Sequence, residues 1–189
     1  MKGFLVGLIL GLIAVPAAAY FYLRLGHPPV AVTDPSLPME QQITNGPLHA
    51  RIDREMAKGA PISPSETNLL VGAQIYREQC AACHGLYGRP SSFGEHMYPD
   101  APQLWQPHGS GVVGVSDDAP GETFWKIKNG IRLTGMPSFE RVLNDTQMWQ
   151  VTLLLANADK PLPSGVLDLM KQPLNFTPAT ASATLPEMK

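Results

Sequence analysis

Two cysteines and a histidine stand close together in this chain, and they are its residues best suited to site chemistry. The stretch QCAACHGLYG, residues 79–88, holds Cys80, Cys83 and His84, and the 189 residues include no further cysteine. Two thiols three positions apart can both bond to one group, and an imidazole beside them can coordinate a metal. The spacing therefore predicts one site that uses all three side chains.

The pattern C-x-x-C-H is the attachment sequence of a c-type haem. Cys80 and Cys83 would add to the two vinyl groups of one porphyrin, and His84 would bind the iron through Nε2 while Nδ1 donates to an outer acceptor. A reactive dithiol, a disulfide or a zinc site would use the same thiols. The sequence lacks the βαβ surroundings of a thioredoxin-like site, and the other four histidines are not spaced as zinc ligands. Covalent haem is therefore the prediction.

An iron with one histidine ligand has a second axial position. The predicted domain offers five candidates for it: Met97, Met136, Met148, His96 and His108. Met148 follows a helical pattern beside Trp149, where a core position is expected. Met136 stands between Gly135 and Pro137, which let the backbone approach the porphyrin closely and then turn. We therefore predict Met136 as the second iron ligand.

Three helices and long loops are expected to position these residues. Ser63 as N-cap and Glu66 three residues later predict a helix that runs into the cysteine motif. A second helix is expected over residues 118–130, and a third begins near residue 144. We expect an ordered, all-α domain over residues 63–160.

The N-terminal segment, residues 1–25, predicts a transmembrane signal-anchor. It carries no charge between Lys2 and Arg24. This uncharged stretch is long enough for a helix to cross the hydrocarbon of a membrane. The small residues Ala17 to Ala19 would also suit cleavage of a signal peptide. Because the apolar run continues into the aromatic cluster that follows, an anchor is favoured.

The segments on either side of the domain are rich in proline. Residues 26–62 predict a tether, with a short helix near its end, and residues 161–189 predict a poorly ordered tail. The net charge of −2 and the absence of long basic runs do not indicate nucleic-acid binding. Lys126, Lys128 and Arg132 gather before Met136, and as a hypothesis this basic edge contacts an acidic partner.

Taken together, these stretches resemble the monohaem class I cytochrome c domains of bacteria. The resemblance rests on GAQIYREQCAACHG, IKNGIRLTGMPSF and NDTQMWQVTLLLAN, in this order within residues 66–158. It implies an all-α class I cytochrome c fold of about three main helices and long loops, wrapped around one covalently attached haem c. It also implies that Gly72 and Tyr76 mark the crossing of the first helix with the last one, against Trp149.

The resemblance further implies an acceptor for the histidine. The carbonyl of Pro102 should accept from Nδ1 of His84, with Pro99 as the alternative. Haem-binding residues would then be Cys80, Cys83, His84, Met136 and Pro102, with His84 and Met136 on the iron. Such a site has no open iron position and is suited to passing one electron.

The predicted function is a membrane-anchored c-type cytochrome that passes single electrons between redox protein partners of an electron-transport chain. It would be an electron carrier and not an enzyme. The nearest alternative is a fixed haem subunit of a larger membrane oxidoreductase. An alternative from another functional class is a haem sensor or peroxidase-like enzyme. Since the resemblance implies haem attachment outside the cytoplasm, we expect a single-pass protein of the cell inner membrane with its haem domain on the periplasmic side.

Overall fold

The computed structural model of the protein describes residues 2–109 and 111–174. These residues fall into two compact units, with the boundary between Gly46 and Pro47. The first unit contains α1, Lys2–Leu25, a helix whose most apolar stretch has a mean hydropathy of 2.3 and buries none of its side chains. By length and composition this helix fits a membrane anchor.

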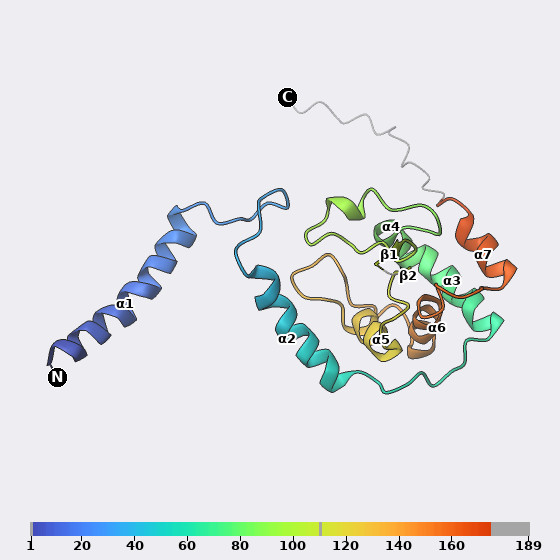
Figure 1. The fold of residues 1–189 in the computed structure, drawn as a ribbon, viewed down its shortest axis with the longest axis horizontal. Helices are drawn as coiled ribbons and strands as arrows, with labels where there is room; N and C mark the ends of the chain where they lie inside the picture. Colours follow the sequence, from blue (N-terminus) through green and yellow to red (C-terminus); the bar gives the residue numbers. More distant parts are fainter. Residues whose placement is uncertain (1, 110, 175–189) are drawn as a thin grey trace, which may run out of the picture. The chain divides into compact units, whose positions relative to one another are not determined.

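Nearly all regular structure in the second unit is helical, which confirms the all-α fold class (Figure 1). Among the described residues, one antiparallel ladder pairs β1 (Pro107–His108) with β2 (Val112–Val113). The elements after α2 are α3 (Glu66–Gln79), α4 (Ala81–His84), η1 (Gly94–His96), β1 (Pro107–His108), β2 (Val112–Val113), α5 (Pro120–Asn129), α6 (Asp145–Leu155) and α7 (Ser164–Lys171).

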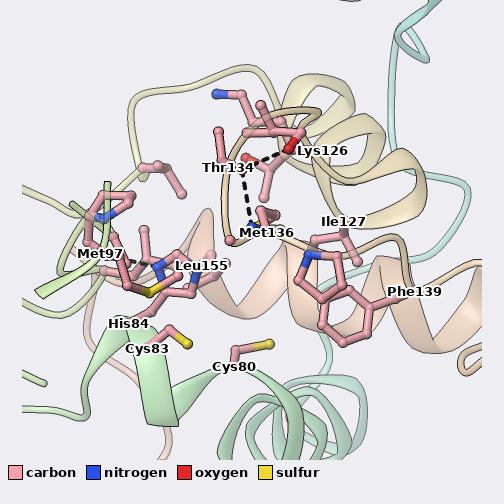
Figure 2. A pocket seen from close by; sticks show the side chains of 18 of the residues that line it. Cys80, Cys83, His84, Met97, Lys126, Ile127, Thr134, Met136, Phe139 and Leu155 are labelled. Carbon is pink, nitrogen blue, oxygen red and sulfur yellow. Dashed lines mark hydrogen bonds between the residues drawn. The ribbon is translucent and has the colours of Figure 1, made fainter. Parts of the chain in front are cut away.

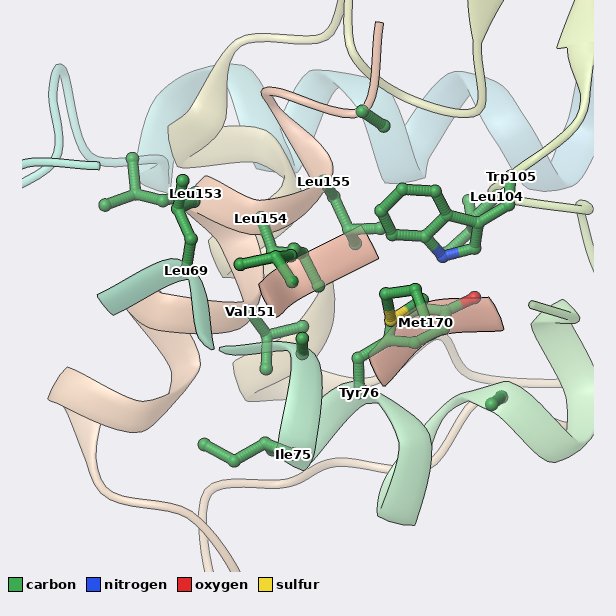
Figure 3. Close-up of a cluster of buried hydrophobic side chains, with 14 of the residues drawn as sticks. Leu69, Ile75, Tyr76, Leu104, Trp105, Val151, Leu153, Leu154, Leu155 and Met170 are labelled. Carbon is green, nitrogen blue, oxygen red and sulfur yellow. The ribbon is translucent and has the colours of Figure 1, made fainter. Parts of the chain in front are cut away.

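The core of this unit is built where α3 crosses α6 (Figure 3). The absence of a side chain at Gly72 allows this crossing, because a Cβ there would collide with the backbone oxygen of Gln150. This confirms the predicted crossing at Gly72. Around it the buried side chains of both helices interlock, among them Leu69, Ala73, Tyr76, Val151, Leu154 and Leu155.

Helix α2, Glu40–Glu55, departs from the predicted tether of residues 26–62. Its second half belongs to the second unit, where only 1% of the Ile52 side chain remains exposed. Glu55 accepts a hydrogen bond from Nε1 of Trp125 in α5, at 2.9 Å. Just after α2, the backbone of Ala57 packs closely against the backbone of α5, because Gly121 has no side chain to keep the Ala57 carbonyl oxygen away. The segment from Pro47 is therefore docked on α5.

The predicted tail also needs correction. Helix α7 packs against α3, and its Val166 and Met170 have no exposed surface. Arg77 of α3 donates to the carbonyl oxygens of Leu169 and Gln172, at 2.8 and 2.7 Å, and so caps the end of α7. The predicted low order of the tail is therefore wrong up to residue 174, and residues 175–189 lie outside the described residues.

Helix starts agree with the sequence in one case and differ by two residues in another. At α6 the N-cap is Asn144, where the sequence predicts the start of the helix, and Asn144 forms a capping box with Gln147. At α3 the N-cap is Ser65, whose hydroxyl accepts from the backbone amide of Asn68, and not Ser63. Ser63 instead accepts a hydrogen bond from the Asn68 side chain through its carbonyl oxygen.

Candidate functional site

A cavity of about 250 Å³ opens in the second unit, with α3 and α4 on one side and the loop after α5 on the other. Most of its lining is apolar, including Leu104, Ile127, Phe139 and Leu155. The structure brings all five predicted site residues to this cavity: Cys80, Cys83, His84, Pro102 and Met136. In Figure 2 the cysteines lie on the helical side and Met136 lies on the loop opposite.

The two cysteines face the cavity because α3 ends where α4 begins. Cys80 caps the C-terminus of α3, and one helical turn later Gly85, at φ 73°, ends α4. Both cysteines are free, and as whole residues they are half-buried. Burial, reinforced by the neighbouring Cys83, raises the pKa of the Cys80 thiol to about 12. A thiol of this kind lacks the lowered pKa that activates catalytic dithiols.

His84 is held by its contacts with the following loop. Its Nδ1 lies 2.8 Å from the carbonyl oxygen of Pro102, while its own carbonyl accepts from the amide of Leu104 at 3.1 Å. Pro99 lines the cavity as well, but the histidine contact is to Pro102. Burial lowers the pKa of His84, although the bond to Pro102 opposes this. The neutral imidazole is thereby favoured, and this is the form that binds metals, with Nε2 free as ligand.

Tyr76 has a role at this site that the sequence did not indicate. The side chain is fully buried, and its hydroxyl donates to the carbonyl oxygen of Gly85 at 2.8 Å. The predicted packing against Trp149 is wrong, because the Tyr76 ring meets Trp105 edge to face at 5.8 Å. Trp149 instead stacks on Phe124 at 4.2 Å. Tyr76 therefore fixes the backbone directly behind the histidine.

The loop of residues 91–103 is tied to the cysteine motif by residues that were not predicted. Ser91 donates through Oγ to the carbonyl oxygen of Ala82, at 2.5 Å. The side-chain Nε2 of Gln103 donates to the carbonyl oxygen of Cys83 at 3.3 Å. The Oε1 of the same side chain accepts a hydrogen bond from the backbone amide of Ser91. An isolated serine and glutamine in a loop carry no recognisable pattern, so only the folded chain reveals this bracing.

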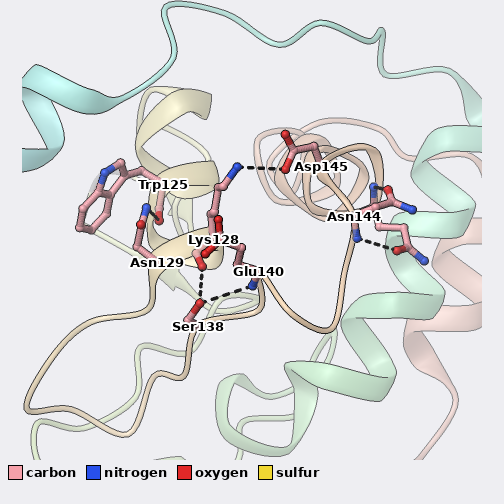
Figure 4. Close-up of polar contacts among 8 residues, drawn as sticks. Trp125, Lys128, Asn129, Ser138, Glu140, Asn144 and Asp145 are labelled. Carbon is pink, nitrogen blue, oxygen red and sulfur yellow. Dashed lines mark hydrogen bonds and ion pairs between the residues drawn. The ribbon is translucent and has the colours of Figure 1, made fainter.

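The loop of residues 131–138 delivers Met136. Gly130, at φ 69°, lets the chain leave α5, and the loop is braced internally by Thr134. Thr134 Oγ1 donates to the carbonyl oxygen of Ile131 at 2.7 Å and accepts from the amide of Met136 at 3.1 Å. At its far end Ser138 donates to the carbonyl oxygen of Lys128 at 2.6 Å (Figure 4).

The other axial candidates lie differently. Met148 is buried in the core, as predicted. His96 and His108 are engaged by backbone carbonyl oxygens of Ser92 and Gly114, at 2.7 and 2.6 Å. Met97, by contrast, lines the same cavity as Met136.

The predicted basic edge before Met136 is largely balanced by carboxylates. Lys126 pairs with Glu122 and Asp118 at 2.6 and 3.4 Å. Lys128 pairs with Asp145 at 3.1 Å (Figure 4). These pairs tie α5 to its own start and to α6, so two of the three predicted cations are engaged within the fold.

The donor set fits a c-type haem. Two free cysteines and an imidazole line a mostly apolar cavity on one side, and the thioether of Met136 lines it on the other. Thiols, imidazole and thioether are the groups that attach and ligate a haem of this class. The fit thus rests on the chemistry of the side chains that the cavity gathers.

Comparison with known proteins agrees with this geometry. Residues 67–154 match the family model described as cytochrome C oxidase, cbb3-type, subunit III. No curated protein and no solved structure gives a significant match to the chain. The matched residues hold the C-x-x-C-H motif and run from α3 to α6. Over residues 67–154 the chain is therefore a monohaem class I cytochrome c domain with covalently bound haem c.

Proposed function

We propose that this protein is a membrane-anchored monohaem cytochrome that passes single electrons between redox proteins. The family match supports a haem-based electron carrier or an oxidase subunit. The observation that carries the finer proposal is the pairing of His84 and Met136 on one mostly apolar cavity. With His84 and Met136 both bound to the iron, no position would be open to a substrate.

Each site residue has an assigned role in the proposal. Cys80 and Cys83 would hold the haem through thioether bonds, and His84 and Met136 would bind its iron. The carbonyl oxygen of Pro102 accepts a hydrogen bond from the Nδ1–H of His84, which would leave Nε2 free for the iron. When bound, haem c supplies an iron that gains and loses one electron. The mostly apolar lining of the cavity would limit the contact of this iron with water.

We further propose that the haem domain lies on the periplasmic side of the inner membrane. Covalent haem attachment in this class implies an extracytoplasmic domain, and α1 supplies an apolar helix of suitable length. Lys2 at its start agrees with a cytoplasmic N-terminus.

Carbon monoxide tests whether the iron is closed. The reduced holoprotein should bind carbon monoxide slowly or not at all, because the gas must displace Met136. The variant Met136→Ala should bind it rapidly, and it serves as the positive control. Rapid binding by the wild-type protein would contradict electron transfer as the function and would favour a sensor or an enzyme.

A fixed subunit of an oxidoreductase is the second candidate. It is favoured by the segments outside the matched residues, since α7 and the end of α2 are both packed on the domain. Purification in mild detergent separates the two candidates. A haem protein free of partners indicates a carrier, whereas stoichiometric retention of other chains indicates a subunit.

A further inference from the structure

A second methionine touches the loop that carries the proposed ligand. Met97 is half-buried, lines the cavity, and places its terminal methyl group against Gly135, the residue before Met136. A Cβ at position 135 would occupy the place of this methyl group. A side chain at position 135 would displace the end of Met97, so glycine suits this close contact.

The position of Met97 is set by the cysteine side of the cavity. Its loop is fixed by the bonds from Ser91 to Ala82 and from Gln103 to Cys83. The Met97 side chain, seen beside His84 in Figure 2, extends from this braced loop to Gly135. The contact thus joins the two loops that meet at the cavity.

The ligand loop is exposed near this contact. Leu133 is 84% exposed and adopts φ 63°, a left-handed conformation that is uncommon for leucine. Gly135 is exposed as well, and the hydrogen bonds of Thr134 join the loop only to itself. Hydrogen bonds to α5 hold the end of the loop, from Ser138 to Lys128 and from the amide of Phe139 to Ile127. Near Gly135 the loop meets the side chain of Met97, which supports it from the other side of the cavity.

We propose that Met97 is a positioning residue of the haem site, closing the cavity between the two loops and keeping Met136 in its ligating position. The inference rests on the proposed His84 and Met136 ligation. Removing the side chain would admit water to the cavity and loosen the ligand loop. Water stabilises the oxidised site, which carries the higher charge, so the reduction potential would fall.

The test uses the full-length holoprotein in detergent. Met97→Ala should keep the thioether–iron charge-transfer band at neutral pH but should have a lower reduction potential. In a guanidinium titration, the charge-transfer band disappears at one midpoint and the helical circular dichroism at another. In Met97→Ala the midpoint for the band should lie further below the midpoint for circular dichroism than it does in wild type. Met97→Leu keeps an apolar side chain of similar volume and should restore both properties. Leu133→Ala is the matched control in the exposed part of the ligand loop and should leave both unchanged.

A double variant tests the contact itself. Gly135→Ala places a methyl group where the end of Met97 lies, so Met97 has to move aside and the potential should shift in the same direction as in Met97→Ala, but by less. Because both changes break one contact, the shift in the double variant should be smaller than the sum of the single shifts.

Two results would overturn the inference. One is a Met97→Ala protein whose potential and band-loss midpoint both equal those of wild type. The other is loss of the band at neutral pH in Met97→Leu, which would make Met97 itself the ligand. Failure of the proposed ligation is detected separately, by a Met136→Ala protein that retains the band.

Discussion

At the scale of single residues, the site depends on side chains that hold the backbone of the C-x-x-C-H motif. Tyr76 is the clearest example, because its buried hydroxyl bonds to the carbonyl oxygen of Gly85. The same hydroxyl lies 3.2 Å from the carbonyl oxygen of His84. The motif supplies the thiols and the imidazole, while the surrounding residues determine where these groups lie.

Tyr76→Phe should therefore destabilise the fold. The variant keeps the ring against Trp105 but leaves the buried carbonyl of Gly85 without its partner, at a cost of about 1–3 kcal/mol. Chemical denaturation followed by circular dichroism measures the free energy of unfolding. Tyr87→Phe, at an exposed position, is the matched control and should change it little. Equal stabilities of the two variants would remove this role from Tyr76.

At the scale of elements, sequence patterns predicted the helices that carry the site better than the segments that cover them. The start of α6 at Asn144 follows from a local capping residue, which a sequence displays directly, whereas the crossing at Gly72 is implied by the resemblance to cytochrome c domains. The docking of α2 depends on Trp125, which lies seventy residues after its partner Glu55. Such a long-range contact leaves only a weak local signal, here Leu48 and Ile52 four positions apart.

The contact between α2 and α5 should weaken in acid. The bond from Trp125, followed by that from Arg51, lowers the pKa of Glu55. A lowered carboxyl pKa stabilises the folded state fully above the ordinary glutamate value of about 4.3, and this contribution is lost as the pH falls through the lower folded pKa. Glu55→Gln should therefore reduce the melting temperature at neutral pH and approach wild type in acid. A difference in melting temperature that does not change with pH would contradict this.

At the scale of the whole molecule, the docked end of α2 shortens the part of the chain that is available as a tether. The compact unit begins at Pro47 and not at residue 63. Between Gly26 and Ala50 the chain has no lysine or arginine, whereas Arg51 and Arg54 lie in α2. Trypsin therefore distinguishes a free tether from a docked helix.

Trypsin should cleave wild-type protein slowly at Arg51 and Arg54, because docking protects the backbone. Ile52→Ala removes a fully buried side chain, a change that typically costs about 2–5 kcal/mol, and should make both sites sensitive. Ile43→Ala alters an exposed isoleucine of the same helix and should not. Mass spectrometry of the fragments gives the answer, and rapid cleavage of the wild type at both sites would restore the tether interpretation.

The proposed pairing of His84 and Met136 is tested most directly by absorption spectroscopy of the oxidised holoprotein. The wild type should give a low-spin c-type spectrum with a thioether–iron charge-transfer band. Met136→Ala should lose this band while its haem stays covalently attached, since Cys80 and Cys83 are intact. A high-spin wild-type spectrum without the band, or a Met136→Ala spectrum identical to that of wild type, would contradict the assignment of Met136 and with it the closed electron-transfer site.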